Sequence, residues 1–476
     1  MIARTGKPSG EEKCPTRQCD WQPNRIKEPR KTASEAASSH GCPCSVNSTP
    51  QLMKNANARN TRMASTNFMG TNCSAFAARR KHPATRRFFL PARGKHSIIR
   101  GMNRMLIFAL LATFAAPAAP LRFYLGTYTD KGNSRGIYTG TLDAATGTLG
   151  PVELAAVAPS PNYLALTPDG KYLYANIATN GGAVAAFRVA SGGQLTRLNE
   201  LPAGNGGCHV SVDATGRNVF VANYGSGSIA SFRTRADGTL VERVAFLPQT
   251  GAGPNPQRQT KPYLHSIYAG PGNTQVYACD LGTDSIWTFA LDASTGALLP
   301  ATPAAAKVPP GSGPRHLAWH PSGNFCFVNG EMGLNVTTFR VASPSGALVP
   351  QLPAQPTLPA DVDTNGFTTA EIVCHPSGRW LYVSNRDVSG RARDSLTVFA
   401  IGADGALTRQ QNIPAGVKIP RGFGVTPAGD WLVVAGQNDN RITVFKIDPT
   451  TGRLTATDQA ATVGAPVCVL FAPPGA

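Results

Sequence analysis

The sequence has few charged residues and no apolar run long enough to cross a membrane. Asp, Glu, Lys and Arg together make up 15% of the 476 residues. One almost wholly apolar stretch, Leu106–Ala116, has eleven residues, whereas a membrane-spanning helix needs about 20. The regular periodicity of an all-α protein is missing as well. These absences exclude a helical membrane bundle and an all-α fold, and we expect no stable membrane insertion.

Acidic residues are scarce, and the resulting positive charge is unevenly spread. The chain has 27 Asp and Glu against 45 Lys and Arg, a formal net charge of +18. Residues 1–100 hold 19 basic and 5 acidic residues, a net charge of +14, which leaves +4 for residues 101–476. The part of the chain that is expected to fold is therefore near neutral, which weakens the case that it binds a polyanion. We therefore expect no nucleic-acid partner.

Residues 1–101 predict no folded domain. They are rich in Ser, Thr, Asn, Arg and Pro and show no period of 2 or 3.6. Cys42 and Cys44 are separated by one residue, which is not the spacing of a zinc finger, and no matching His pair follows. We interpret this segment as a disordered or mis-assigned N-terminal extension.

Residues 102–118 have the order of a secretory signal peptide. A short basic start at Met102 precedes the apolar run, and Ala116-Pro117-Ala118 has the small-x-small form of a cleavage site. The competing interpretation is a twin-arginine export signal around Arg86 and Arg87. Both interpretations predict a periplasmic or secreted protein, and a cytoplasmic location is the alternative.

Residues 119–476 repeat a pattern that predicts many short strands. The motif Gly-x-Leu recurs about every 50 residues, six or seven residues after an alternating strand. A second motif, a Pro-Asp-Gly or Pro-Ser-Gly type of turn followed by an alternating strand, occurs six times, for example as TPDGKYLYAN and HPSGRWLYVSN. The Gly-x-Leu glycines are Gly147, Gly193, Gly238, Gly296, Gly346, Gly405 and Gly452, and the turn glycines are Gly170, Gly216, Gly272, Gly323, Gly378 and Gly429.

Four antiparallel strands per repeat are typical of a propeller blade. The fold class is therefore all-β: a seven-bladed β-propeller of four-stranded antiparallel blades in one domain. The missing seventh turn is explained if the C-terminal segment APVCVLFAPPG pairs with the N-terminal segment FYLGTY. This pairing would close the ring and remove open sheet edges.

Counting from each turn glycine predicts polar side chains gathered at one mouth of the propeller. Adjacent antiparallel strands bring the residues before and after the turn to the same end. Seven residues before the glycine stand Tyr163, His209, His265, His316, Glu371 and Gly422; one residue earlier stand Asn162, Cys208, Leu264, Arg315, Ala370 and Arg421; eight residues after it stand Ala178, Tyr224, Asp280, Glu331, Arg386 and Gln437. Several imidazoles, carboxylates and guanidiniums in one place indicate a functional site. The alternative is a structural role, in which they bridge the blades through hydrogen bonds and water.

Other candidate residues favour structural interpretations. His320 and His375 occupy the turn position of the two HPSG motifs, where they are expected to cap the turn. The five cysteines after residue 102 all fall in predicted strands, which favours buried thiols over disulfides. Cys208, which stands next to His209, is a weaker candidate nucleophile.

The segments GPRHLAWHPSG, VNGEM, SNR and IPRGFGVTPAGDWLVVAGQ resemble the lactonase family of seven-bladed propellers. That family includes propeller-type 6-phosphogluconolactonases and carboxy-muconate lactonizing enzymes, and the resemblance runs from about Phe123 to Pro474. It implies a catalytic set of His265, Arg315, Glu331 and Arg386. The chain departs from the family at Gly330, where the family usually has Asn before the Glu.

The resemblance implies a carboxylic-ester hydrolase that opens a sugar lactone, with 6-phospho-glucono-1,5-lactone of the pentose phosphate route as the namesake substrate. His265 or Glu331 would be the general base, Arg315 would stabilise the oxyanion and Arg386 would hold the anionic part of the substrate. His209, His316, Glu371, Arg421 and Gln437 are expected to bind substrate. The scheme needs no metal or other cofactor, and we expect a monomer. An export signal favours another anionic or an unphosphorylated lactone, and a muconate cycloisomerase and a non-catalytic binding propeller are further alternatives.

Overall fold

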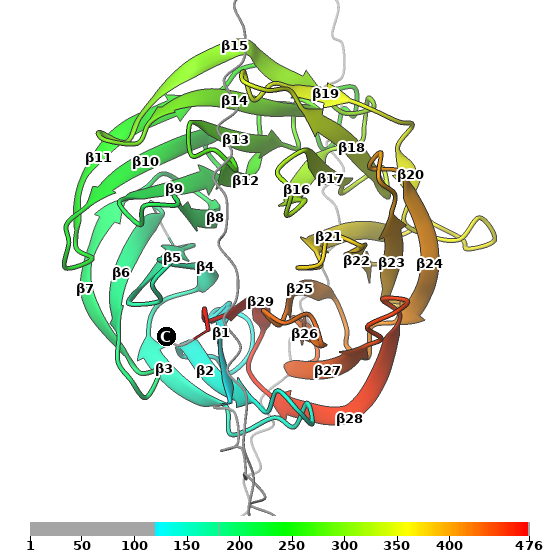
Figure 1. Ribbon diagram of the computed structural model, residues 1–476. Helices are drawn as coiled ribbons and strands as arrows, with labels where there is room; N and C mark the ends of the chain where they lie inside the picture. Colours follow the sequence, from blue (N-terminus) through cyan, green and yellow to red (C-terminus); the bar gives the residue numbers. More distant parts are fainter. Residues whose placement is uncertain (1–119, 180, 475–476) are drawn as a thin grey trace, which may run out of the picture. The chain divides into compact units, whose positions relative to one another are not determined.

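The computed structural model describes residues 120–179 and 181–474, and in this part of the chain every regular element is a β-strand. The strands form seven antiparallel sheets arranged in a ring around a central channel (Figure 1). The prediction of an all-β, seven-bladed propeller is confirmed. The proposed extension and the signal peptide of residues 102–118 lie outside the described residues. The described part has no helix that is long and apolar enough to cross a membrane.

Each blade is built of four strands from the channel outward. Blade one consists of β29 (Pro466–Phe471), β1 (Leu121–Thr127), β2 (Gly136–Leu142) and β3 (Glu153–Val157); blade two of β4 (Pro161–Leu166), β5 (Tyr172–Ile177), β6 (Ala183–Val189) and β7 (Leu195–Pro202); blade three of β8 (Gly207–Val212), β9 (Asn218–Asn223), β10 (Ser228–Thr234) and β11 (Leu240–Pro248). Blade four consists of β12 (Leu264–Ala269), β13 (Gln275–Asp280), β14 (Ser285–Asp292) and β15 (Ala297–Lys307); blade five of β16 (Pro314–Trp319), β17 (Phe325–Gly330), β18 (Asn335–Val341) and β19 (Leu348–Pro350), with β20 (Gln355–Pro356) also on β18; blade six of β21 (Phe367–Cys374), β22 (Trp380–Asp387), β23 (Ser395–Ile401) and β24 (Leu407–Pro414); blade seven of β25 (Pro420–Val425), β26 (Trp431–Gly436), β27 (Arg441–Ile447) and β28 (Leu454–Thr462).

The first blade takes its innermost strand from the other end of the chain. β29 pairs with β1 in antiparallel fashion, with Phe123 opposite Phe471 and Gly126 opposite Cys468. The predicted closure of the ring is therefore confirmed. The pairing gives blade one four strands like the other blades and joins the two ends of the described chain in one sheet.

The apolar core lies between neighbouring blades. Middle strands are packed on both faces, so their residues do not alternate in exposure; all six residues of β9 are buried. The outermost strands face solvent on one side, and β11 is largely exposed after its first residue. Burial on both faces explains why the middle strands are nearly continuous apolar runs in the sequence.

The Gly-x-Leu motif marks the points where one blade touches the next. Gly147 and Gly452 have φ values of 73° and 69°, in the left-handed region. A Cβ atom on Gly147 would lie 2.3 Å from the ring of Trp431, and one on Gly452 would lie 2.3 Å from the ring of Trp380. Conformation and space both require glycine, which is why the motif repeats.

The carbonyl of this glycine also accepts a buried hydrogen bond from the preceding blade. Where the second strand carries a tyrosine, its hydroxyl is the donor; where that position is Phe220 or Phe327, a hydroxyl of the third strand replaces it. The bonds are Tyr174 to Gly238 (2.9 Å), Ser231 to Gly296 (2.8 Å), Tyr277 to Gly346 (2.6 Å), Thr338 to Gly405 (3.2 Å) and Tyr382 to Gly452 (3.0 Å). Five blade junctions thus share the same hydrogen bond to the glycine carbonyl, and its donor is a hydroxyl group of either the second or the third strand.

The histidines of the HPSG motifs cap their turns and join blades, as expected. Nδ1 of His375 lies 2.8 Å from Oγ of Ser377, and its Nε2 lies 2.9 Å from the carbonyl oxygen of Gly429 in the next blade. His320 makes the equivalent contacts with Ser322 and Gly378. The five described cysteines are free thiols in strands, in agreement with the sequence.

The register of blade four differs from the sequence expectation by one residue. In the other turns a glycine is left-handed, but here Asn273 has φ 52° and closes the turn with Gly270. Asn tolerates this conformation, so Asn273 and not Gly272 is the equivalent position. His265 therefore shares a repeat position with Arg315, not with His209 and His316.

The repeat position that His265 shares with Arg315 is a β-bulge near the start of the innermost strands. In blades two to seven, the pairing between the first and second strands shifts register at this position, so the residue there faces no single partner. The residues there are Asn162, Cys208, His265, Arg315, Ala370 and Arg421. Bulges of this kind redirect side chains next to functional sites.

The grouping of Asp280 with Glu331 was also wrong, because the turn of blade four is shifted by one residue. Leu281 takes the position that corresponds to Glu331, and Asp280 accepts hydrogen bonds from the N–H of Tyr263 and the indole N–H of Trp287.

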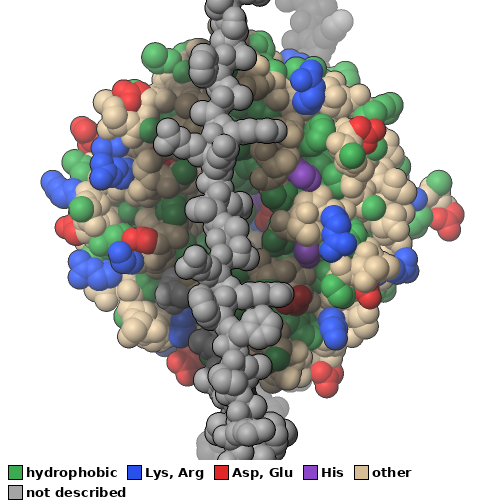
Figure 2. Space-filling model, in the orientation of Figure 1, with side chains coloured by type: hydrophobic (Ala, Val, Ile, Leu, Met, Phe, Trp, Pro, Cys, Tyr) green, Lys and Arg blue, Asp and Glu red, His purple; other side chains and the backbone are tan. Residues whose placement is uncertain are grey.

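Charges on the visible rim are mixed in sign. Figure 2 shows Lys and Arg side chains dispersed among Asp and Glu around this face of the ring, with no broad patch of one sign. This distribution agrees with the small net charge of the residues after 100.

Candidate active site

Glu331 forms the centre of a cluster of guanidinium groups at one mouth of the channel. Its Oε1 lies 2.7 Å from Nη2 of Arg258. Its Oε2 lies 3.1 Å from Nε of Arg315 and 3.2 Å from Nη2 of Arg386. Only 8% of the Glu331 side chain is exposed, so these ion pairs are shielded from water and salt.

The charges around Glu331 fix its ionisation state. Burial alone would raise the pKa of its carboxyl group, but Arg386, Arg315 and Arg258 outweigh burial and lower the pKa to about 2. Glu331 is therefore ionised at every pH at which the protein would work, and three cations compete for its lone pairs.

The backbone around Glu331 is held from both sides. Its N–H donates to the carbonyl of Gly313 and its carbonyl accepts from the N–H of Thr369. The preceding Gly330, the departure from the family pattern, has no room for a side chain: a Cβ atom there would lie 2.6 Å from Oγ of Ser312 and from Oδ1 of Asn335. Ser312 and Asn335, themselves hydrogen-bonded at 2.9 Å, fill the space that an asparagine at position 330 would need.

Arg258 was missed by the sequence analysis and comes from the loop between β11 and β12. The next residue, Gln259, is completely buried, and its amide donates to the carbonyl of Leu281 and to Oδ1 of Asp284, each at 2.8 Å. Asn255 caps the turn that carries Arg258. The loop is thus anchored beside the site, and it presents the guanidinium to Glu331.

His265 lies beside Glu331 as a neutral imidazole. Its Nε2 is 3.9 Å from Oε2 of Glu331, beyond direct hydrogen-bond distance. Burial and the charge of Arg315 lower the pKa of His265 well below its usual value, so the pair is not a salt bridge near neutral pH. The gap is the size that one bridging water fills.

A cavity of about 390 Å³ opens over this cluster. It is lined by His265, Glu331, Arg386, Arg421 and Arg258, together with Tyr128, Asn162, Ala178, Gly206, Gly207, Cys208 and Tyr224. Within the described part of the chain Arg421 pairs with no carboxylate; its guanidinium lies 5.6 Å from the centre of the Tyr128 ring. The cavity thus has one buried anion, a neutral imidazole and a surplus of guanidiniums.

Comparison with known proteins places this chain in one family. Residues 122–471 match the family described as "Lactonase, 7-bladed beta-propeller". The chain belongs to this lactonase family. The 6-phosphogluconolactonase of Bacillus subtilis is 35% identical over 354 residues, which cover 73% of this chain and 97% of that protein. The 6-phosphogluconolactonase of Formosa agariphila is 30% identical over 339 residues, which cover 70% and 94%.

A solved relative has the same fold. The periplasmic gluconolactonase of Pseudomonas aeruginosa superposes with a TM-score of 0.69 at 28% identity, covering 75% of this chain and 99% of that one. The resemblance read from the sequence motifs is therefore confirmed.

Arg315 of this lactonase lies below the cavity, not on its wall. It lines a small recess with His316, Cys208 and Arg421, and only 2% of Arg315 is exposed. Its Nε is engaged by Glu331 and its Nη1 donates to the carbonyl of Ala370 at 2.6 Å. Arg315 is thus placed to position Glu331, which departs from the oxyanion role that the resemblance implied.

His209 and His316 lie deeper in the channel of the lactonase than predicted. Both are buried, and the His209 ring packs between the rings of Tyr163 and Tyr268, at centroid distances of 4.1 and 4.5 Å. Burial lowers the pKa of both imidazoles well below the usual value. Neither lines the 390 Å³ cavity, so direct contact with a substrate there is not supported for them.

Glu371 and Gln437 also lie apart from the cavity. Glu371 accepts from Ile372 N and faces Nδ1 of His316 at 2.7 Å, but it opens toward the opposite mouth of the channel. Gln437 lines an adjacent pocket that shares Arg386 and Arg421 with the site. The prediction of a single mouth was wrong for Glu371, because it follows the bulge position in β21 and its side chain projects the other way along the channel.

A nucleophilic role for Cys208 has little support from the structure. Burial raises the pKa of the Cys208 thiol to about 12, and this thiol donates to the carbonyl of His265 at 3.1 Å, which suits a structural role. Among the described residues no three His, Cys, Asp or Glu side chains gather as metal ligands.

Proposed function

We propose that the protein hydrolyses an anionic sugar lactone to the aldonic acid in the 390 Å³ cavity. The observation that carries the proposal is the position of neutral His265 at 3.9 Å from ionised Glu331, under a surplus of guanidinium groups. A buried neutral imidazole can accept a proton from water, and fixed cations can stabilise the negative charge that develops on the carbonyl oxygen.

His265 suits the role of general base better than Glu331. Three guanidiniums hold the pKa of Glu331 at about 2 despite its burial, so its carboxylate is a weak base. Nε2 of His265 would take a proton from a water held between it and Oε2 of Glu331. Glu331 would orient this water and stabilise the imidazolium ion that forms.

The oxygen of that water then attacks the lactone carbonyl carbon, and the carbonyl oxygen becomes an oxyanion. Arg386 is the candidate donor to the oxyanion, because it lines the cavity and its buried Nε has no partner among the described residues. When the ring C–O bond breaks, the His265 imidazolium returns its proton to the leaving ring oxygen. The product is a hydroxy acid, and the histidine is neutral again.

Arg421 is the best candidate for binding the anionic group of the substrate. Arg258, Arg315 and Arg386 are paired with Glu331, whereas Arg421 faces the cavity without a carboxylate partner in the described residues. A guanidinium matches phosphate and carboxylate in bidentate geometry. A phosphorylated lactone, as in the names of the two 6-phosphogluconolactonase relatives, fits this arrangement.

The test compares 6-phospho-glucono-1,5-lactone with glucono-1,5-lactone by following acid release. We expect the wild-type protein to prefer the phosphorylated substrate. Arg421→Ala should reduce kcat/KM for it by about 10²-fold while reducing kcat/KM for the unphosphorylated lactone far less. Lack of turnover of any lactone by the folded protein would contradict the proposal and favour a binding propeller.

A second candidate is an exported lactonase that acts on an unphosphorylated lactone. The leader-like order of residues 102–118 supports export, and a solved relative is described as a periplasmic gluconolactonase. Fractionation of cells that express the full chain, with antibody detection, tests the location. A preference for glucono-1,5-lactone that Arg421→Ala leaves unchanged would favour this candidate over the first.

A further inference from the structure

A second and larger cavity lies at the opposite mouth of the channel. It encloses about 650 Å³ and shares no lining residue with the active-site cavity. It is formed by the carboxyl-terminal ends of the innermost strands β4, β16, β21, β25 and β29, whereas the active site lies at their amino-terminal ends. Its wall is apolar, with Leu166, Leu317, Phe423, Val425 and Leu470 among the lining residues.

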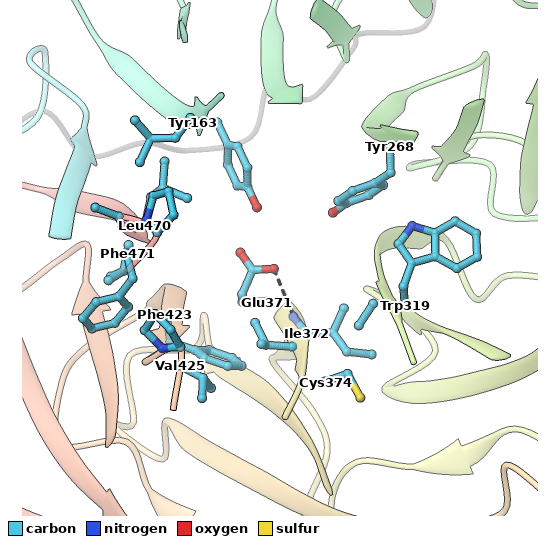
Figure 3. Close-up of a pocket in the computed structure, with 18 of the residues that line it drawn as sticks. Tyr163, Tyr268, Trp319, Glu371, Ile372, Cys374, Phe423, Val425, Leu470 and Phe471 are labelled. Atoms are coloured by element: carbon cyan, nitrogen blue, oxygen red, sulfur yellow. Dashed lines mark hydrogen bonds between the residues drawn. The ribbon is translucent and has the colours of Figure 1, made fainter. Parts of the chain in front are cut away.

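The inner end of this cavity is polar and aromatic. Figure 3 shows the hydroxyl groups of Tyr163 and Tyr268 directed toward the carboxyl group of Glu371, with Trp319 beside them. Glu371 is 5% exposed, and one of its oxygens is engaged by Ile372 N at 3.1 Å and by Nδ1 of His316 at 2.7 Å. Figure 3 shows the other oxygen turned toward Tyr163 and the cavity.

Glu371 is the one residue with a formal charge among those that line the cavity. A buried carboxylate without a cation beside it is costly, and a ligand that brings the cation removes this cost. The hydroxyl oxygens of Tyr163 and Tyr268, which point toward the same carboxyl group (Figure 3), can accept hydrogen bonds from the same cation. We propose that this cavity binds an organic ammonium ion with an apolar body, whose charged head meets Glu371 and whose body packs on the apolar wall.

Trp319 adds a requirement to the ligand. Its indole N–H is buried and has no partner among the residues that the structure describes, although it belongs to the cavity wall. A buried donor without an acceptor is unfavourable. A ligand with an oxygen on its apolar body would satisfy it, so an aryl-alkyl amine with a hydroxyl group fits the cavity better than a plain hydrocarbon amine.

The ionisation of Glu371 supplies a second signature. Burial raises its pKa to about 7, so binding of a cation would be coupled to loss of its proton. The titratable groups that face it are His316 on β16, Tyr163 on β4, Tyr268 on β12 and Cys468 on β29, with Arg315 and Arg421 acting from farther away. None of the first four is positively charged near neutral pH, since burial lowers the pKa of His316.

Calorimetry with the purified full chain tests the proposal, with tyramine as the probe and tyrosol as its uncharged analogue. We expect saturable binding of tyramine, binding of tyrosol weaker by about tenfold or more, and a rise in tyramine affinity between pH 6 and pH 8. Glu371→Gln keeps the size of the side chain and should weaken tyramine binding by about tenfold or more. Equal binding of tyramine and tyrosol by the wild-type protein would overturn the proposal. This comparison needs only the wild-type protein.

The active-site variant Glu331→Gln is the matched control. It removes a carboxylate from the other mouth, so tyramine affinity should stay unchanged. Equal loss of affinity in both variants would place the amine in the active site and overturn the proposal. Retention of wild-type affinity by Glu371→Gln, or absence of saturable tyramine binding by the wild-type protein, would overturn it as well.

Discussion

Arg258 and Glu331 are joined at 2.7 Å although one lies on a loop between two blades and the other follows a strand of blade five. The arginine side chain is 41% exposed on a loop, and the glutamate side chain is 8% exposed at the end of a strand. The ion pair closes the side of the cluster that faces solvent. A substrate anion that enters the cavity would therefore meet Arg258 before it reaches the other paired guanidiniums.

Replacing Arg258 should impair catalysis without unfolding the protein. Arg258→Ala removes the only partner of Oε1 of Glu331 among the described residues, so the carboxylate loses one of its three fixed contacts. We expect kcat/KM for the lactone to fall by about 10- to 100-fold, with the melting temperature nearly unchanged. Steady-state kinetics and thermal unfolding measure the two effects.

Arg235→Ala is the control for loss of a positive charge, because Arg235 is exposed on the turn between β10 and β11. It should leave kcat/KM within about twofold, as expected for a distant surface charge. If Arg258→Ala behaves like Arg235→Ala, the pair with Glu331 has no part in the reaction.

The dependence of activity on pH should separate the two candidate bases. Burial and Arg315 lower the pKa of His265 well below 6.5, so His265 stays neutral at neutral pH. We expect kcat/KM to be constant between pH 6.5 and 8 and to fall only in more acidic solution. His265→Asn should lose about 10²- to 10⁴-fold in kcat. Activity maintained until pH approaches the Glu331 pKa of about 2 would assign the base to Glu331.

Glu371 should make stability fall as pH rises through neutrality. Its folded-state pKa is about 7, raised by burial from an ordinary value of 4.5. The folded state thus binds this proton more tightly than the unfolded state, and the resulting stability is complete below pH 4.5 and lost as pH rises through 7. Between pH 5 and pH 8 the free energy of unfolding should fall by about 2.5 kcal/mol more in the wild-type protein than in Glu371→Gln. Urea titrations at the two pH values measure this, and parallel changes in both proteins would contradict it.

The hydroxyl of Tyr382 should contribute measurably to the junction between blades six and seven. It donates to the carbonyl of Gly452 at 3.0 Å in a buried position, so Tyr382→Phe leaves that carbonyl unpaired. We expect a loss of about 1 kcal/mol in the free energy of unfolding. Tyr124 occupies the same repeat position in β1, and its hydroxyl has no partner among the described residues. Tyr124→Phe should therefore cost little, and equal effects of the two substitutions would show that the junction bond contributes nothing.

The fold could be predicted from the sequence because its key contacts are local and repeated. Glycines such as Gly147 and Gly452 are required at every blade junction by conformation and by space, so they leave a visible period. The closing strand was predictable from the missing seventh turn. In blade four the count failed by one residue, because Asn273 adopts the left-handed conformation that glycine has elsewhere.

The site could be predicted only in part. Counting along the repeat found His265, Glu331 and Arg386, and the family resemblance implied their catalytic roles. The structure brings them to one cavity with Arg421, while those roles remain predictions. Arg258 was missed because its loop lies outside the repeat. Glu371 was misplaced because neighbouring residues of a strand project in different directions, and a bulge decides which one reaches which mouth.

The pairing of β29 with β1 has a consequence for how the ring assembles. Phe123 and Phe471 are neighbours in space but lie near opposite ends of the described chain, and contacts between distant segments slow folding because a large loop must close first. A circular permutant that joins residue 474 to residue 120 through a short linker, with new termini in the turn between β28 and β29, would turn this pairing into a local hairpin. Such a chain should refold faster than the native order and still build the same active site.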